Sequence, residues 1–333
     1  MTVLAPVAAP PQVLVRCRDL VRPALATAVG RLHPWVGEMA GYAFGWCEAG
    51  GSPAAAPSGK GVRQALAVLG AEAAGAPAER GVPAAVAVEL VHAFSLVHDD
   101  IMDGDATRRG RPAVWQAYGT GAAVLAGDAL FALAVETLAG APGGPGTLRL
   151  LSAALADLVH GQADDLLFAA RPWTDVSVRE YRTVAERKTG ALLGCALALG
   201  AALGGAPDAT VAALDMAGRH LGVAFQLVDD VLGIWGDPAV TGKPVHGDLR
   251  ERKKTYPVLA ALGSPAGTRL APLLDTPARA AEAAVLIEEA GGRAAALAEA
   301  RRHTARAEAL LAGPSPASAE LRGLLDFLVR RDL

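Results

Sequence analysis

The 333-residue sequence predicts an all-α fold. Between breaks rich in Gly and Pro, the chain is rich in Ala and Leu and has few runs of alternating β-branched residues. Apolar residues instead recur every three or four positions, as in the series Val86, Leu90, Phe94, Val97 and Ile101, which is the spacing of one helical face. Because 52% of the residues are hydrophobic and 20% are charged, the chain can form a large core. No segment is predicted to be a strand.

The predicted elements follow one another along a single domain, which we place at residues 13–333. We expect residues 1–12 to be disordered. Clusters of Gly, Pro and Ser predict loops at residues 50–58 and 140–147. Helical periodicity predicts helices at about residues 84–102, 148–170, 176–203, 209–234 and 278–313.

One uncharged segment could be either a core helix or a membrane helix. Residues 189–207 carry no charge over a length that approaches a membrane span. Alanine, glycine and small aliphatic residues dominate, with Lys188 before the segment and Asp208 after it. We therefore favour a helix that is buried on all sides over a transmembrane segment.

Composition also limits the compartment and the partners. Cys17, Cys47 and Cys195 lie far apart with no CxxC spacing, so the sequence predicts neither a disulfide framework nor a zinc site. The N-terminus lacks a basic region followed by an apolar stretch, so we expect no signal peptide and a cytoplasmic protein. A formal net charge of −3 gives no reason to expect nucleic acid as a partner.

The stretch HDDIMDGDATRRGR concentrates acid and then base in a chain of nearly balanced charge. Asp99 and Asp103 are four residues apart, so on a helix they share one face within about 40°, and His92 lies on the same stripe. Such a carboxylate pair can hold magnesium together with substrate phosphates, although a solvated acidic helix end has the same pattern. Arg108 and Arg109 follow the acids, which indicates a polyanionic ligand that contacts both metal and guanidinium groups.

A second acidic cluster lies far along the chain, in a mostly apolar helix. Gln226, Asp229 and Asp230 occupy positions i, i+3 and i+4 of one face. Because aspartate is seldom buried without a partner, two facing Asp helices that share magnesium would explain both clusters. The lysines support a phosphate ligand, since lysine is a compact point charge, although simple retention on the surface is the alternative. The chain's lysines are Lys60, Lys188, Lys243, Lys253 and Lys254.

Taken together, these stretches resemble the trans-isoprenyl diphosphate (polyprenyl) synthases, from about residue 55 to the C-terminus. A single DDxxD motif would be weak evidence for this family, but several sequence motifs occur here in the same order as in the family. They are GKxxR at Lys60 and Arg63, ELVH ending at His92, DDIMD followed by RRG, GDAL at 127–130, GQADDL at 161–166, KTG at Lys188, FQLVDD at 225–230, and GDPxxTGK at 236–243.

The resemblance implies the isoprenoid synthase fold, an antiparallel helix bundle around a deep central cavity, usually as a homodimer. It implies about three magnesium ions, two on Asp99 and Asp103 and one on Asp229, with Asp100 and Asp230 supporting these sites. It implies contacts to the allylic diphosphate (dimethylallyl, geranyl or farnesyl) from Arg108, Lys188, Thr189, Gln226 and Lys243. It implies contacts to the diphosphate of isopentenyl diphosphate from Lys60, Arg63, His92 and Arg109.

The sequence departs from the family pattern in places. The second acidic motif ends in Gly233 where the family has a third Asp, which we expect to weaken magnesium binding without abolishing activity. The first substrate motif has Gly61 and Gln64 at unusual positions. VHGD at 245–248 replaces the more usual GSD, and we expect His246 to be a loop residue.

Two residues before the first Asp are expected to set product length. In the family these positions form the cavity floor, here Phe94 and Ser95, and Phe94 lies about 7–8 Å along the helix axis from Asp99. The bulky ring beside a small residue resembles short-chain synthases that make geranylgeranyl diphosphate, with farnesyl diphosphate close behind, although Phe94 could equally be ordinary core. Two other functions remain open, a class I terpene cyclase and a non-catalytic synthase subunit, but a cyclase needs no second diphosphate site and such subunits typically lose more of the aspartates.

Overall fold

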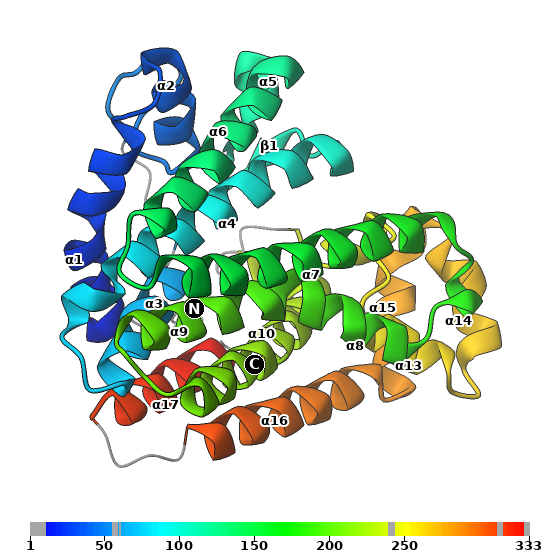
Figure 1. The fold of residues 1–333 in the computed structure, drawn as a ribbon. Helices are drawn as coiled ribbons and strands as arrows, with labels where there is room; N and C mark the ends of the chain where they lie inside the picture. Colours follow the sequence, from blue (N-terminus) through cyan, green and yellow to red (C-terminus); the bar gives the residue numbers. More distant parts are fainter. Residues whose placement is uncertain (1–10, 55–58, 60, 239–243, 312–315, 330–333) are drawn as a thin grey trace, which may run out of the picture.

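The computed structural model describes residues 11–54, 59, 61–238, 244–311 and 316–329, and within them the chain is almost entirely helical (Figure 1). Helix α10 packs against α9 and α16, α3 packs between α9 and α4, and α4 packs against α6. The longer helices are α1 Gln12–Val29, α3 Val62–Ala73, α4 Val82–Asp103, α6 Thr120–Ala139, α7 Gly144–Ala170, α9 Ala191–Leu203, α10 Asp208–Trp235, α16 Gly292–Leu310 and α17 Pro316–Val329.

Shorter elements connect these helices and close the ends of the bundle. At one end of the bundle, α2 and α5 lie beside α6, and α12 to α15 gather at the far end of α10 and α16 (Figure 1). The shorter helices are α2 Pro34–Ala43, η1 Ala78–Gly81, α5 Val114–Tyr118, η2 Trp173–Asp175, α8 Val178–Ala185, the π-helical turn η3 Glu186–Gly190, α12 Gly247–Arg250, α13 Tyr256–Leu262, α14 Gly267–Leu274, η4 Pro277–Arg279 and α15 Ala280–Glu289.

The centre of the bundle is α9, which confirms the prediction of a core helix in the uncharged segment. All of its residues except Ala202 are buried. Its small residues allow close helix contacts: a Cβ at Gly218 of α10 would lie 2.5 Å from the Cα of Gly194 in α9. Such an approach is open only to glycine, so the Gly and Ala content of the sequence sets the spacing of the central helices.

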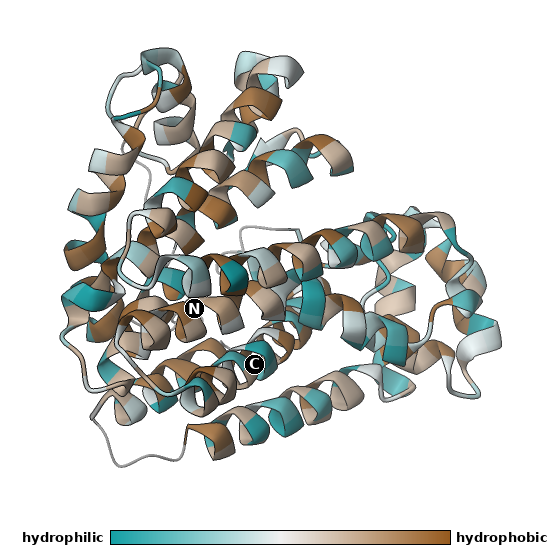
Figure 2. Cartoon of the chain, viewed as in Figure 1, coloured by the Kyte–Doolittle hydropathy of each residue, from teal (hydrophilic) through white to brown (hydrophobic). Residues whose placement is uncertain are grey.

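Two helices are long and apolar enough to cross a membrane by length and composition alone. They are Ala78–Asp103, with 61% of its most apolar window buried in the structure, and Thr120–Ala139, with 44% buried. Apolar residues run along both helices in Figure 2. The first is a central helix of the bundle and carries the first acidic cluster at its end.

The structure corrects several predicted boundaries. A short antiparallel hairpin, β1 Thr107–Arg108 and β2 Arg111–Pro112, follows the first acidic cluster, where no strand was predicted. The helix expected at 278–313 is broken by Gly291, whose φ of +78° ends one helix and starts the next. The loop expected at 140–147 ends early because α7 begins at Gly144. Residues 1–10 lie outside the described residues.

Candidate functional site

The first acidic cluster occupies the last turn of α4, as predicted. The helix ends at Asp103 because Gly104 adopts a left-handed conformation, with φ of +70°. Asp99 is half-buried and Asp103, one turn further on, is exposed. Burial raises the pKa of Asp99 to about 6, and the charge of Asp103 adds to this although Lys188 opposes it. Two crowded carboxyl groups with raised pKa values are groups that a bound divalent cation would stabilise in their charged form.

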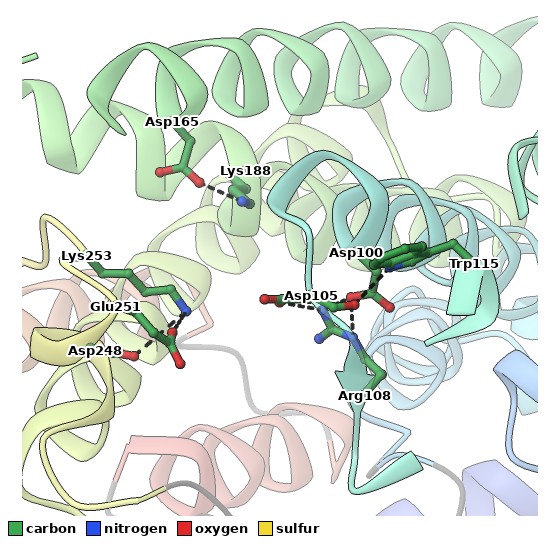
Figure 3. A network of polar contacts seen from close by, with 9 residues as sticks. All are labelled: Asp100, Asp105, Arg108, Trp115, Asp165, Lys188, Asp248, Glu251 and Lys253. Carbon is green, nitrogen blue, oxygen red and sulfur yellow. Dashed lines mark hydrogen bonds and ion pairs between the residues drawn. The ribbon is translucent and has the colours of Figure 1, made fainter. Parts of the chain in front are cut away.

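A lysine on the opposite wall faces these carboxylates. Lys188 projects from the π-helical turn η3, and its Nζ lies 2.7 Å from Oδ2 of Asp165 in α7. Burial lowers the pKa of Lys188, but Asp165 and Asp99 outweigh it and hold the ammonium in its charged form. Glycine makes this geometry possible, because a Cβ at Gly161 would lie 2.6 Å from the backbone nitrogen of Lys188. Figure 3 shows Asp165 and Lys188 across from the end of α4.

Arg108 is held in the site by a buried carboxylate. Asp100 is only 3% exposed and accepts a hydrogen bond of 2.8 Å from Nε of Arg108, with a second contact from the same guanidinium. The hairpin presents Arg108 here because Arg109 and Gly110 both have positive φ, as a tight β-hairpin turn requires. Asp100 therefore binds Arg108 in the described structure. Asp99 and Asp103 share a neighbouring face of the same helix, α4.

The second acidic cluster on α10 joins the KTG turn through hydrogen bonds. Thr189 Oγ1 donates to Oε1 of Gln226 at 3.0 Å, and Nε2 of Gln226 donates to Asp230 at 3.1 Å. Asp229, three residues after Gln226 on α10, is half-buried. Because Lys188 interacts with Asp99 while the adjacent Thr189 bonds Gln226, the η3 turn connects the two predicted acidic clusters in space.

Asp230 is bound by protein donors. It is 3% exposed and accepts hydrogen bonds from the Tyr181 hydroxyl and, at 2.9 Å, from the backbone N–H of Tyr256. Burial raises the pKa of Asp230 to about 7, while the bonds from Tyr181 and Tyr256 oppose that shift. The carboxylate of Asp230 therefore links α10 to α8 and α13.

Three basic side chains from distant segments meet in a second group. Nη1 of Arg63 lies 3.1 Å from Nε2 of His92. Burial and the charges of Arg63 and Arg109 lower the pKa of His92 well below its usual value. Burial and Arg109 also lower the pKa of Arg63 to about 10, against the attraction of Glu89. His92 is therefore neutral, and the two positive charges of Arg63 and Arg109 lie close enough to each other to indicate an anion site.

Phe94 and Ser95 lie on α4 below the first acidic cluster. The Phe94 ring packs edge-on against His98 at a centroid distance of 4.9 Å and, with its ring plane tilted, against Phe131 of α6 at 5.5 Å. Ser95 is buried and donates to the carbonyl of His92 at 2.9 Å. Phe94 therefore stands one to two turns from Asp99, beside a second aromatic side chain.

Sequence reasoning assigned no role to Asp165 or Asp248 and only a general one to Lys253. Nζ of Lys253 lies 2.6 Å from Oε2 of Glu251 and 3.9 Å from Oδ1 of Asp248, and Lys253 acts on the pKa of Asp103 from across the site. Figure 3 shows Asp248, Glu251 and Lys253 as a third group facing the other two. The scarcity of lysine was a signal for Lys253, and Asp165 lies in the GQADDL motif at 161–166, to which no role was assigned.

The donor set fits magnesium that is bound jointly with a substrate. Within the part of the chain that the structure describes, no three His, Cys, Asp or Glu side chains form a group that could hold a metal ion. Magnesium in proteins commonly uses one or two carboxylates together with waters and substrate phosphates. Asp99 and Asp103 fit that chemistry. The predicted phosphate contacts Lys60 and Lys243 lie outside the described residues.

Comparisons with known proteins show the family of this chain. The polyprenyl synthetase family model matches residues 46–289. A (2E,6E)-farnesyl diphosphate synthase of Mycobacterium tuberculosis H37Rv is 46% identical, over 96% of this chain and 92% of that protein. A geranylgeranyl diphosphate synthase of the same organism is 47% identical, over 84% of this chain and 82% of that protein.

Solved structures of polyprenyl synthases have a similar fold. The crystal structure of a polyprenyl synthetase from Streptomyces coelicolor A3(2) superposes with a TM-score of 0.91 at 47% identity, covering 96% of this chain and all of that one. That of a geranylgeranyl pyrophosphate synthetase from Pyrococcus horikoshii gives 0.85 at 32% identity, covering 96% of this chain and 99% of that one. With the fold, the ordered motifs and the family model in agreement, the chain belongs to the polyprenyl synthetase family.

Proposed function

We propose that this prenyltransferase condenses isopentenyl diphosphate head-to-tail with an allylic diphosphate, dimethylallyl, geranyl or farnesyl, in a magnesium-dependent reaction. The observation that supports this proposal is that the charged side chains form two separate clusters. One combines Asp99 and Asp103 with Lys188, and the other combines Arg63, His92 and Arg109. Two diphosphate sites suit a reaction between two diphosphates.

Cleavage of the allylic C–O bond is the difficult step, because the departing diphosphate accumulates negative charge. Fixed cations aimed at that group stabilise it most effectively where water is scarce. Lys188 and Arg108 fill this role, and Thr189, Gln226 and Lys243 contact the same diphosphate. Arg108 is held for this purpose by Asp100 at 2.8 Å.

Magnesium, about three ions held by Asp99, Asp103 and Asp229, would neutralise and orient the same diphosphate. Asp230 serves as a positioning residue, since its carboxylate already accepts hydrogen bonds from Tyr181 and Tyr256. Asp100 and Asp230 therefore support the metal sites through Arg108 and Gln226.

The second site holds isopentenyl diphosphate so that its double bond meets the allylic cation. Lys60, Arg63 and Arg109 bind its diphosphate as cations, and neutral His92 contributes a hydrogen bond. A new C–C bond forms, and a proton is then lost to the released diphosphate. Holding both substrates at contact distance supplies much of the rate.

Product length rests on the side chains below Asp99. Phe94 with the small Ser95 beside it would stop the growing chain at a short product, geranylgeranyl or farnesyl diphosphate. Phe94 is braced by Phe131, so its ring has limited freedom to move aside. The two relatives from one organism make different products and are almost equally similar to this chain, so identity does not choose between them.

We place the enzyme in the cytoplasm as a homodimer of single domains spanning residues 13–333. The dimer is supported by α6, whose exposed face carries Val124, Leu125 and Phe131. An apolar helix face of this kind suits a second copy of the chain.

Product analysis tests the function. Purified protein is incubated with magnesium, isopentenyl diphosphate and each allylic starter in turn, and the products are separated by chromatography. We expect a linear prenyl diphosphate from at least one starter. A cyclic hydrocarbon formed from geranylgeranyl diphosphate alone would instead indicate a cyclase, and no product from any combination would indicate a non-catalytic subunit.

A further inference from the structure

The third arginine of the RRGR stretch, Arg111, has no role in the function proposed above. It is the first residue of β2, and the register of the hairpin pairs it directly with Arg108 of β1. Its guanidinium contacts α2 and the loop that follows α2. Only 17% of its side chain is exposed. A cation buried to this degree needs partners that the fold provides.

Several contacts place the Arg111 side chain against this part of the chain. Nη2 donates to the carbonyl of Cys47 at 2.7 Å and lies 3.0 Å from Oε2 of Glu48. Nη1 lies 3.5 Å from the carbonyl oxygen of Tyr42, and the guanidinium lies 4.1 Å from the centre of the Tyr42 ring. A planar guanidinium suits this position because it donates several hydrogen bonds from a rigid plane while it stacks on an aromatic ring.

The same tyrosine also holds β2 by its hydroxyl group. Tyr42 is 5% exposed, and its hydroxyl donates to the carbonyl of Pro112 at 2.7 Å. The loop after α2, residues 44–54, is closed by a backbone hydrogen bond of 3.1 Å from the N–H of Ala54 to the carbonyl of Trp46. Helix α2 and this loop therefore form an ordered support for β2.

A hairpin this short needs such a support. Its strands have two residues each, and an isolated two-stranded hairpin is at best marginally stable in water. Its turn contains Arg109 at a φ of +54°, a conformation that persists in a residue with a side chain only where the surrounding contacts impose it. On β1, Arg108 is held by Asp100. On β2, Arg111 and Tyr42 supply the corresponding contacts.

The other two arginines of the hairpin reach different clusters. Burial raises the pKa of Asp99, and the charge of Arg108 opposes that rise. Burial lowers the pKa of His92, and the charge of Arg109 adds to that fall. A Cβ at Gly59 would lie 2.7 Å from Nη2 of Arg109, so this guanidinium also packs against the start of the first substrate motif. A displacement of β2 would therefore move a cation at each cluster.

We propose that Arg111 is a positioning residue: its contacts with α2 and residues 44–54 hold the hairpin so that Arg108 meets the allylic diphosphate and Arg109 meets that of isopentenyl diphosphate. This role rests on the function proposed above. It couples the two sites, because one side chain bound to α2 sets the position of a cation at each diphosphate.

Ligand binding by Arg111→Met tests this role, since methionine keeps an apolar stem and removes the hydrogen bonds. Calorimetry gives the Kd of isopentenyl diphosphate without magnesium and of an unreactive allylic diphosphate analogue with magnesium. Thermal unfolding without ligand reports folding separately. A hydrogen bond to a charged group contributes roughly 10- to 150-fold, so we expect a misplaced arginine at each site to raise both Kd values about tenfold.

The matched control is Arg322→Met. Nη1 of Arg322 donates to the carbonyl of Leu311 at 3.2 Å, so the control also removes a contact between a guanidinium and a backbone carbonyl. That contact joins α17 to the end of α16, and neither helix holds a residue assigned to a diphosphate. We expect both Kd values of the control to stay within about twofold of the native values.

Combination with a second substitution separates positioning from a general loss of stability. If Arg111 acts on isopentenyl diphosphate through Arg109, Arg111→Met should raise that Kd by less than about twofold once Arg109→Ala is present. The same should hold for the allylic analogue in the Arg108→Ala protein. Losses that multiply in both combinations would overturn the proposal, as would a folded Arg111→Met protein that binds both ligands with native Kd values.

Tyr42→Phe gives a second test should Arg111→Met fail to fold. It keeps the ring beneath Arg111 and removes only the hydroxyl that bonds Pro112. We expect it to raise both Kd values about threefold, and unchanged values would also overturn the proposal. A native protein that binds neither ligand would instead refute the proposed function, so the two failures are distinguished.

Discussion

The Asp100–Arg108 pair offers the most direct test of how the site is positioned. Asp100→Asn keeps the shape of the side chain but removes the charge that holds Arg108. Asp100 is 3% exposed, and hydrogen bonds to charged groups are worth roughly 1.5–3 kcal/mol. If all of that energy serves to hold Arg108 against the departing diphosphate, kcat/KM for the allylic substrate falls by at most about 10- to 150-fold.

The assay is steady-state condensation at saturating magnesium, so that changes in metal affinity do not contribute. The matched control is Glu136→Gln, which breaks an ion pair of 3.0 Å with Arg31 whose two side chains are 64% and 49% exposed. Exposed pairs contribute little, so we expect the control to retain native kcat/KM. A folded Asp100→Asn enzyme that is no slower than the control would refute the role given to Arg108.

Three other predictions concern product length, substrate binding and stability. Phe94→Ala is expected to lengthen the products seen by chromatography, and an unchanged profile would remove Phe94 from the cavity floor. Arg109→Ala is expected to raise KM for isopentenyl diphosphate at least about tenfold with a smaller effect on the allylic substrate, and equal effects on both would contradict separate sites. Burial lowers the pKa of His303 to about 4, with His220 adding to this. Because the unfolded histidine binds a proton near pH 6.5, this group destabilises the fold progressively as pH falls from about 6.5 to 4, by at most about 1.4 kcal/mol per pH unit. Denaturant titrations at pH 7 and pH 5 should show that His303→Gln removes this loss of stability at the lower pH. If the free energy of unfolding depends on pH identically in both proteins, His303 is not its cause.

The periodic parts of the sequence predicted their elements well. Apolar spacing placed the helix that ends at Asp103, and the uncharged segment was correctly assigned to a core helix. The family and fold expected from the ordered motifs are confirmed by the family model and by the solved relatives. These features follow from local pattern and from motif order, which a sequence displays directly.

Features that depend on contacts between distant segments escaped prediction. The hairpin at 107–112 requires positive φ at Arg109, a residue that seldom adopts it, so no propensity indicated a turn there. The ion pair of Asp165 with Lys188 and the placement of Asp248 over Gly233 both depend on how α7, α10 and α12 pack. The roles given to Arg63 and His92 came from resemblance, and the structure adds that they lie 3.1 Å apart.

The most direct test is whether one diphosphate is bound through metal and the other through protein side chains without metal, and calorimetry with and without a metal chelator measures this. We expect isopentenyl diphosphate to bind with nearly the same affinity whether or not magnesium is present. An unreactive allylic diphosphate analogue should need magnesium to bind with measurable affinity. Equal dependence of both ligands on magnesium would contradict the division of the site into a metal-bearing half and a purely basic half.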